Sequence, residues 1–280
     1  MNRTVLSLFP GIGMLDAQFE AEAFCVVRGP DPLWGGDVRK FHPPAGLFDG
    51  LFDGVIGGVI GGPPCQDFSA ARRSPPTGYG VEMLSEFCRV VLAAQPKWFV
   101  CENVPSVPDL EIDGYTIQRI DVEQAWWSGV RRQQLIQFGR HSSIIDASHS
   151  LDIPRGTIAN GAEPCALACD ERPFTELCRL QGLPDDFELP AFHDKARRQA
   201  VGNGVPALMG RKIAQAVRLA VYGESCSDDP MPTFRSGRRS CDVCERPVSG
   251  KQLTCSARCR KRRSLRAASR VTVTVAGESQ

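Results

Sequence analysis

The sequence predicts an α/β fold with a doubly wound sheet and helices on both of its faces. The first observation behind this prediction is that short apolar runs alternate with amphipathic ones through the first half of the chain. The second is the run 52–60, which is apolar and β-branched enough to form a buried parallel strand. The third is size, because 280 residues with 42% hydrophobic and 23% charged content can bury one good core and a small appendage.

The alternation sets the expected order of the elements. A strand over 4–9 is followed by a glycine-containing turn, a helix over about 14–23 and a second strand over 24–27. The chain is then expected to continue with a strand over 53–60, a helix over 81–94, a strand over 98–101 and a later strand over 135–138.

Residues 47–62 contain two tandem duplications, Leu-Phe-Asp-Gly twice and then Val-Ile-Gly-Gly twice. A shift of four residues keeps the period-2 facing of a strand, so either copy fits the same place in a sheet. We expect the copy nearest Pro63 to form the strand. Pro63 and Pro64 make the following turn rigid, because each proline fixes its own φ and restricts the residue before it. Cys65 is therefore predicted at the C-terminal edge of the sheet, where open α/β folds bind ligands.

Several properties of the sequence indicate the cellular compartment in which the protein acts. No apolar run is long enough for a transmembrane helix, and Pro10 and Gly11 interrupt the short apolar stretch near the N-terminus. Twelve cysteines in 280 residues are not dense enough for a disulfide scaffold. We therefore expect a cytoplasmic protein with no membrane partner.

Charge is distributed unevenly along the chain. Residues 235–270 hold 12 Lys or Arg against two acidic residues, whereas residues 1–234 hold 21 basic groups against 29 acidic ones. A strongly basic segment typically meets a polyanion, and nucleic acid is the expected one. The alternative is a solvated extension that only aids solubility. Residues 223–240, rich in Ser, Asp, Pro and Gly, are predicted to be a linker that precedes it.

The basic segment also carries four cysteines at metal-ligand spacing, namely Cys241, Cys244, Cys255 and Cys259. Four thiolates in this pattern suit tetrahedral zinc, and the site is expected to be structural because all four positions are filled. The run from Cys255 to Arg263 resembles the start of the helix in a treble-clef zinc finger. The alternative is an unfolded tail with free thiols.

Five segments together resemble the cytosine-5 methyltransferases, in that family's order and over roughly residues 1–222. They are Leu6-Ser-Leu-Phe-Pro-Gly-Ile-Gly-Met, Gly-Gly-Pro-Pro-Cys65-Gln-Asp-Phe-Ser, Cys101-Glu-Asn-Val, Arg179-Leu-Gln-Gly-Leu-Pro-Asp-Asp-Phe and Gly202-Asn-Gly-Val-Pro. The resemblance implies a Rossmann-like, S-adenosylmethionine-dependent methyltransferase domain over 1–222. It places a short target-recognition region at 141–173, followed by the linker at 223–240 and a zinc finger at 241–270.

The resemblance also implies a reaction and residues for it. Cytosine C5 is a poor nucleophile, and a thiolate that adds to C6 makes the ring able to attack an electrophilic methyl group. Cys65 is the predicted nucleophile, and Glu102 is predicted to hold N3 if burial raises its pKa. A cation near O2 is expected from Arg131 or Arg132. Only one of these can enter the pocket because adjacent strand residues face opposite ways, and we favour Arg132.

S-adenosylmethionine is the expected methyl donor. In the first glycine loop, the residues expected to bind it are Phe9, Gly11 and Gly13. Two acidic residues are also expected to bind it, Asp31 after the second strand and Asp37 in the next motif. The closing motif is expected to contribute Asn203 and Val205. The target base must leave its stack, and residues near the flipped nucleotide are expected to be Pro64, Gln66, Ser69 and Asn103.

The sequence therefore predicts a DNA (cytosine-5-)-methyltransferase that binds double-stranded DNA and acts as a monomer. Two alternatives stay open. One is an RNA methyltransferase, since a tRNA-methylating branch of the family keeps much the same motifs. The other is a non-catalytic DNA-binding protein on the same scaffold, against which the intact pair of Cys65 and Glu102 argues.

Overall fold

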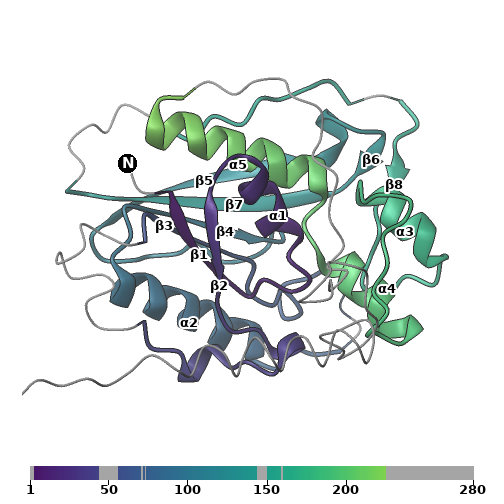
Figure 1. The fold of residues 1–280 in the computed structure, drawn as a ribbon, viewed down its shortest axis with the longest axis horizontal. Helices are drawn as coiled ribbons and strands as arrows, with labels where there is room; N and C mark the ends of the chain where they lie inside the picture. The colour runs from purple at the N-terminus through teal and green to yellow at the C-terminus, as the bar shows by residue number, and fades with distance from the viewer. Residues whose placement is uncertain are drawn as a thin grey trace, which may run out of the picture.

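A computed structural model describes residues 3–43, 56–70, 72, 74–143, 150–158 and 160–224. Its main sheet has six strands within this part of the chain, in the order β2-β1-β3-β4-β7-β5 (Figure 1). The strands are β1 (Thr4–Leu8), β2 (Cys25–Arg28), β3 (Gly58–Gly61), β4 (Trp98–Asn103), β5 (Tyr115–Glu123) and β7 (Gln133–His141). Neighbours among β1, β2, β3 and β4 are parallel, whereas β7 is antiparallel to both β4 and β5.

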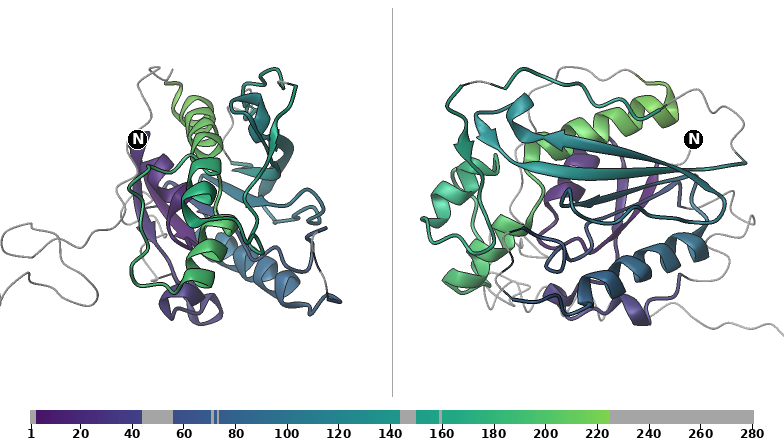
Figure 2. Two further views of the ribbon diagram at one scale, coloured as in Figure 1. Left: turned by 90° about the vertical axis from the view of Figure 1, so that its right-hand side faces the viewer. Right: turned by 180° about the vertical axis from the view of Figure 1, so that it is seen from behind.

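Side chains of the central strands alternate between two cores. Val5, Ile60 and Val100 belong to one core, and their neighbours in sequence Leu6, Val59 and Phe99 belong to the other. The first core is covered by α1 (Met14–Ala21) and α5 (Ala207–Tyr222), and the second by α2 (Tyr79–Ala94). Figure 2 shows these helices on opposite faces of the sheet. The expected α/β architecture with helices on both faces is confirmed.

A third apolar cluster lies at the end of the molecule formed by α3 (Phe174–Leu180) and α4 (Asp194–Asn203), at the right of Figure 1. A two-stranded sheet of β6 (Val130–Arg131) and β8 (Glu163–Pro164) lies nearby. Met14, the first residue of α1, packs into this cluster and joins it to the main fold.

The duplicated segment contributes the copy that the sequence favours. β3 consists of Gly58–Gly61, so the Val-Ile-Gly-Gly copy nearest Pro63 forms the strand. The strand is shorter than the expected 53–60, and residues 44–55 lie outside the described residues. The linker beyond residue 224 and the four cysteines of the predicted zinc finger also lie outside them.

The close packing around one glycine of the sheet leads to a testable prediction. Gly139 of β7 pairs with Phe99 of β4, and a Cβ atom at position 139 would overlap carbons of the Phe99 ring. That ring is fully buried against Phe87 and Tyr115 and has no room to move. We expect Gly139→Ala to lower the free energy of unfolding by about 1–3 kcal/mol, measured by urea denaturation.

The matched control for this prediction is Gly129→Ala. A Cβ atom at position 129 meets nothing within 4 Å, so the unfolding free energy should change by less than about 0.5 kcal/mol. Equal stability of the two variants would contradict the packing argument.

Within the described ranges, no helix combines the length and the apolar character that a bilayer crossing requires.

Candidate active site

A cavity of about 440 Å³ lies at the carboxyl ends of β1, β3 and β4. Parallel strands that end at one edge of a sheet bring their following loops together there. Three such loops line the cavity, and segments around α4 close its other side. The predicted residues that reach it are Phe9, Gly11, Asp31, Pro64, Cys65, Gln66, Glu102, Asn103, Arg132, Asn203 and Val205.

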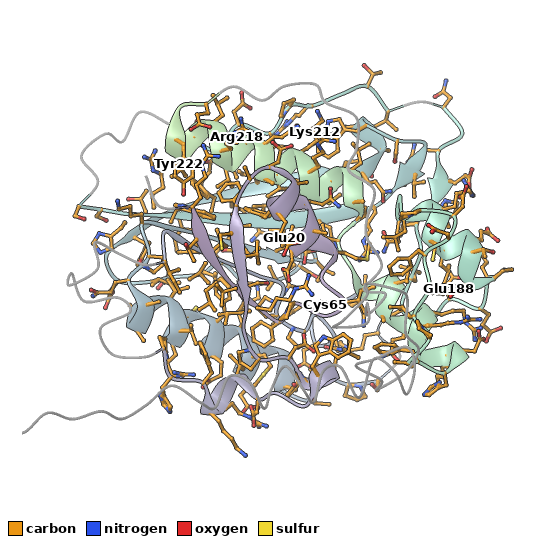
Figure 3. The ribbon with its side chains drawn as sticks, viewed as in Figure 1. Glu20, Cys65, Glu188, Lys212, Arg218 and Tyr222 are labelled. Carbon is orange, nitrogen blue, oxygen red and sulfur yellow. The ribbon has the colours of Figure 1, made fainter. Side chains whose placement is uncertain are left out.

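Cys65 follows β3 on the predicted turn and lies near the centre of the view in Figure 3. The backbone amides of Phe68 and Ser69 both donate to its carbonyl oxygen at 2.9 Å, which closes the turn. The thiol is half-buried, and burial is the main reason why its pKa lies above the ordinary value. The negative charge of Glu102 raises that pKa further, while the positive charge of Arg132 lowers it.

Glu102 lies in β4, and its side chain is turned into the cavity although the residue is only 7% exposed. Burial raises the pKa of its carboxyl to about 7, and Arg132 opposes this shift. The carboxyl lies against Gly62, where a Cβ atom would come within 2.9 Å of Oε2. A carboxyl with this pKa can hold or release a proton near neutral pH.

Arg131 and Arg132 face opposite ways, as expected. Arg131 is exposed on β6, outside the residues that line the cavity, whereas Arg132 lines it. The Nη1 of Arg132 donates to the carbonyl oxygens of Ala166 at 3.0 Å and Gly202 at 2.9 Å. These two bonds hold the guanidinium close enough to influence the pKa values of both Cys65 and Glu102.

Asn103 connects the loop after β3 to the loop after β4. Its Nδ2 donates to the carbonyl oxygen of Pro63 at 3.0 Å, and its Oδ1 accepts from the amide of Val104 at 2.9 Å. The amide thereby ties the loop after β4 to the turn that carries Cys65. This geometry suits a residue that orients the loop.

Asp31 lines the cavity beside the first glycine loop, which follows β1. Its carboxylate accepts from the backbone amides of Gly11 at 2.8 Å and Leu33 at 2.7 Å. Phe9, Gly11 and Gly13 all have positive φ, which lets the loop turn tightly at the end of β1. Phe9 is the one non-glycine residue of these three, and its ring is buried in the core under the sheet.

Besides Arg131, three predicted residues of the described part of the chain are not among those that line the cavity: Asp37, Ser69 and Gly13. The side chain of Asp37 accepts from the backbone amide and the guanidinium of Arg39, and these bonds lower its pKa. Gly13 caps the start of α1, where a Cβ atom would come within 2.7 Å of the Arg28 guanidinium. The structure therefore does not bring Asp37 to the cavity.

The sequence reasoning missed two buried carboxylates near the site. Asp16 lines the cavity, accepts from the Ser7 hydroxyl at 2.6 Å and from Arg28 at 2.9 Å, and burial raises its pKa. Asp67 accepts from the backbone amides of Thr77 and Gly80 at 2.7 Å each, which ties the Cys65 loop to the start of α2. An acidic residue in the first turn of a helix is typical of helix starts, so Asp16 carried no separate signal.

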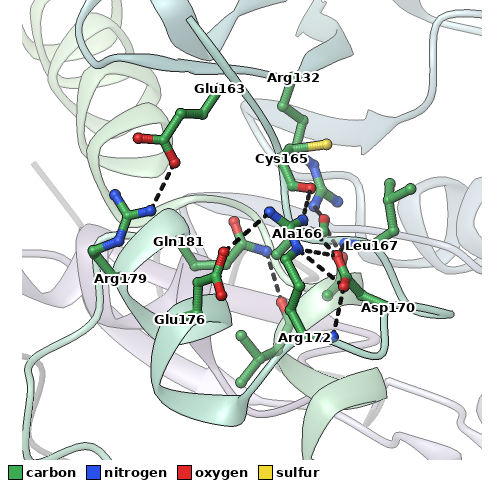
Figure 4. A network of polar contacts seen from close by, with 12 residues as sticks. Arg132, Glu163, Cys165, Ala166, Leu167, Asp170, Arg172, Glu176, Arg179 and Gln181 are labelled. Atoms are coloured by element: carbon green, nitrogen blue, oxygen red, sulfur yellow. Dashed lines mark hydrogen bonds and ion pairs between the residues drawn. The ribbon is translucent and has the colours of Figure 1, made fainter.

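The segment predicted as the recognition region is attached to the fold by arginines. Arg179 of α3 forms an ion pair of 2.7 Å with Glu163 in β8. Within the segment itself, Arg172 binds Asp170 and donates to the carbonyl oxygen of Cys165 at 2.7 Å. Figure 4 shows these contacts next to Arg132, so the same segment also supports the wall of the cavity.

Comparison with known proteins agrees with this arrangement. The family model described as C-5 cytosine-specific DNA methylase matches residues 35–120, which include both Cys65 and Glu102. The type II methyltransferase M.HgiDI of Herpetosiphon aurantiacus is 29% identical over 101 residues. That match covers 32% of this chain and spans about one third (33%) of the relative's length.

Two solved structures share the fold at low sequence identity. A DNMT2 variant of Spodoptera frugiperda has a TM-score of 0.53 at 10% identity, covering 78% of this chain and 99% of that one. The methyltransferase EhMeth of Entamoeba histolytica has a TM-score of 0.51 at 13% identity, covering 78% of this chain and 98% of that one. The match to the family model over residues 35–120 and the match to M.HgiDI both support the cytosine-5 methyltransferase family.

Proposed function

We propose that the chain is a DNA (cytosine-5-)-methyltransferase that acts on a flipped-out cytosine through a covalent adduct with Cys65. The observation that carries this proposal is that Cys65, Glu102 and Arg132 line one cavity, where Glu102 and Arg132 act on the pKa of Cys65 and Arg132 also lowers the pKa of Glu102. A nucleophile, a proton-holding acid and a cation within one enclosed site are what this chemistry requires.

The residues of the site suit S-adenosylmethionine as the methyl donor. Asp31 lines the cavity beside the glycine loop, and Asn203 and Val205 line it from the end of α4. An acidic side chain can accept from ribose hydroxyls, and a loop with positive φ lets backbone approach a ligand. When bound, the cofactor supplies an electrophilic methyl group.

The protein's own residues then carry the remaining steps. Cys65, as the thiolate, forms a bond to C6 of the base, and Glu102 holds N3 as negative charge develops on the ring. Arg132 stabilises that charge near O2. A protonated Glu102 also no longer raises the pKa of Cys65, so thiolate formation becomes easier when the acid carries its proton. After methyl transfer to C5, the C5 proton passes to solvent water, the bond between C6 and the Cys65 sulfur breaks, and the thiolate leaves as the C5–C6 double bond re-forms.

The experiment that tests this function is transfer of labelled methyl from S-adenosylmethionine to unmethylated duplex DNA of varied sequence, with tRNA as a parallel substrate. Label recovered as 5-methylcytosine in DNA supports the proposal. Label recovered only in tRNA would redirect it to the RNA-methylating branch. No label in either substrate, with cofactor binding intact, would support a binding role instead.

We further propose that the basic segment 241–270 is a zinc finger that adds DNA affinity to a methyltransferase domain over 1–222, joined by the linker 223–240. The recognition region at 141–173 is short, and a cationic finger compensates by binding phosphates. The protein is expected to act as a cytoplasmic monomer.

Removal of residues 235–280 tests the role of this segment, because it leaves the proposed methyltransferase domain over 1–222 whole. We expect weaker DNA binding and a shallower dependence of affinity on salt concentration, since fewer phosphates are neutralised. Fluorescence anisotropy with labelled duplex at several salt concentrations measures both. Unchanged affinity and salt slope would contradict the proposal.

A further inference from the structure

The loop that joins β4 to β5, residues 104–114, crosses back over the face of the sheet that α2 covers. Three of its side chains are buried in the core on that face: Val107, Leu110 and Ile112. The loop contains no helix or strand, so its backbone carbonyl groups have no ladder to bind them. Backbone groups held against a core need hydrogen-bond partners, and side chains of the sheet supply them here.

One of these side chains is Arg119 of β5, the edge strand beyond β7. Its Nη2 donates to the carbonyl oxygen of Pro105 at 2.6 Å, and its Nη1 donates to that of Val107 at 3.3 Å. The guanidinium also forms an ion pair with Asp109. A planar guanidinium has five N–H groups in a fixed arrangement, so it can bind all three acceptors at once.

Ser106 lies between the two residues whose carbonyl groups this guanidinium binds. Its Oγ donates to the carbonyl oxygen of Phe68, and the amide of Phe68 donates to the carbonyl oxygen of Cys65 at 2.9 Å. Asn103 makes the corresponding contact on the other side of the thiol, at the carbonyl oxygen of Pro63. The loop after β4 therefore holds the Cys65 turn at two points, one before the nucleophile and one after it.

The two points of attachment differ in what fixes them. Asn103 is the last residue of β4, so the sheet itself determines its position. Ser106 lies in irregular chain, and the contacts that fix its two neighbours come from Arg119. The position of the second attachment therefore depends on one side chain of a distant strand.

The next part of the loop is held by a different residue. Oε1 of Gln137, in β7, accepts from the amide of Leu110 at 2.7 Å, and its Nε2 donates to the carbonyl oxygen of Pro108 at 3.0 Å. Loss of the Arg119 guanidinium therefore releases the backbone around Ser106 and leaves these contacts in place.

We propose that Arg119 is a positioning residue, which fixes both neighbours of Ser106 and thereby holds the turn that presents Cys65 to the cavity. Its effect on methyl transfer rests on the proposed function. Arg119 is not among the residues that line the cavity, so it acts on the reaction through this loop. A nucleophile displaced by about 1 Å loses roughly 100-fold in rate, and we expect a smaller loss because Asn103 still holds the turn.

The test compares Arg119→Met with Arg89→Met in the full-length protein. Arg89 of α2 is a close match, because it donates to the carbonyl oxygens of Val38 at 2.9 Å and Phe41 at 3.0 Å and pairs with Glu86. The two arginine side chains are also similarly exposed, 38% for Arg119 and 34% for Arg89. Both variants thus lose two bonds to backbone and one ion pair, but only one of them touches the loop that holds Cys65.

We expect kcat for methyl transfer to fall roughly 10-fold in Arg119→Met and to stay within about twofold in Arg89→Met. The melting temperature should fall by a similar amount in both, and the affinity for S-adenosylmethionine should be unchanged in both. A merely structural role would lower kcat equally in the two variants or in neither, and either result would overturn the inference.

Ser106→Ala tests whether Arg119 acts through the contact with the Cys65 turn. This variant keeps every bond of Arg119 and removes the bond to Phe68. We expect a loss in kcat similar to that of Arg119→Met, and the double variant should be no slower than the slower single variant within about twofold. If the two losses multiply, Arg119 acts by another route and the inference is overturned.

Alkylation by iodoacetamide measures the position of the thiol without any substrate. In Arg119→Met we expect Cys65 to react roughly threefold faster or more, because a loosened turn exposes this half-buried thiol, while the half-buried Cys165 keeps its rate. An unchanged rate at Cys65 would overturn the inference even if wild type transfers methyl. If wild type transfers methyl to neither DNA nor tRNA, the proposed function fails, and faster alkylation of Cys65 still supports the hold of Arg119 on the turn.

Discussion

Replacement of Cys65 by alanine is expected to abolish methyl transfer, with a loss of about 10⁴-fold or more in kcat. Without the sulfur no adduct forms at C6, and the neutral ring leaves C5 too weak a nucleophile to attack a methyl group. The remaining residues of the cavity cannot replace it, because Glu102 holds a proton near neutral pH and Arg132 is a cation. Single-turnover transfer of labelled methyl to duplex DNA measures the loss.

The same variant should keep its fold and its cofactor affinity. The turn is held by the backbone carbonyl of Cys65 and by Asn103 and Asp67, none of which the substitution removes. Cys88→Ala is the matched control, since Cys88 lies half-buried on α2 and outside the residues that line the cavity. Residual activity in Cys65→Ala above about 1% of that in Cys88→Ala would exclude a covalent mechanism through this thiol.

The parts of the fold that sequence reasoning predicted are those that local pattern determines. β3 ends where two prolines prevent further pairing, and the period-2 facing of a strand allowed the choice between the duplicated copies. The same alternation selected Arg132 over Arg131. These predictions depend only on residues that are adjacent in the sequence, so the sequence alone is enough to make them.

The features that were missed depend on contacts between distant segments. The position of β7, antiparallel between β4 and β5, is such a case. The apolar run of β7 does not indicate whether the strand pairs in a parallel or an antiparallel direction. Asp37 is a different case, because its carboxylate is bound by Arg39, only two residues along the chain, and lies outside the residues that line the cavity.

Glu102 is expected to make the protein's stability depend on pH in a defined window. Burial raises the pKa of its carboxyl from the ordinary 4.5 to about 7, so between these values the folded state holds a proton that the unfolded state has lost. Folding is therefore favoured at low pH, and this contribution is lost as pH rises from about 4.5 through about 7. At 1.36 kcal/mol for each unit of pKa difference, the loss is about 3 kcal/mol. Urea denaturation at pH 5, 6, 7 and 8 measures it.

Glu102→Gln removes this titration, because an amide keeps the size and hydrogen-bonding shape of the protonated acid without a charge. Its unfolding free energy should exceed that of wild type by about 3 kcal/mol at pH 8 and by only about 1 kcal/mol at pH 5. Asp16 also has a raised pKa, but it titrates in both proteins and cancels in the difference. Asp170 titrates at about 2, below the window. Parallel stability curves for the two proteins would mean that Glu102 is ionised in the folded state at neutral pH, and its assignment as the acid that holds N3 would then be wrong.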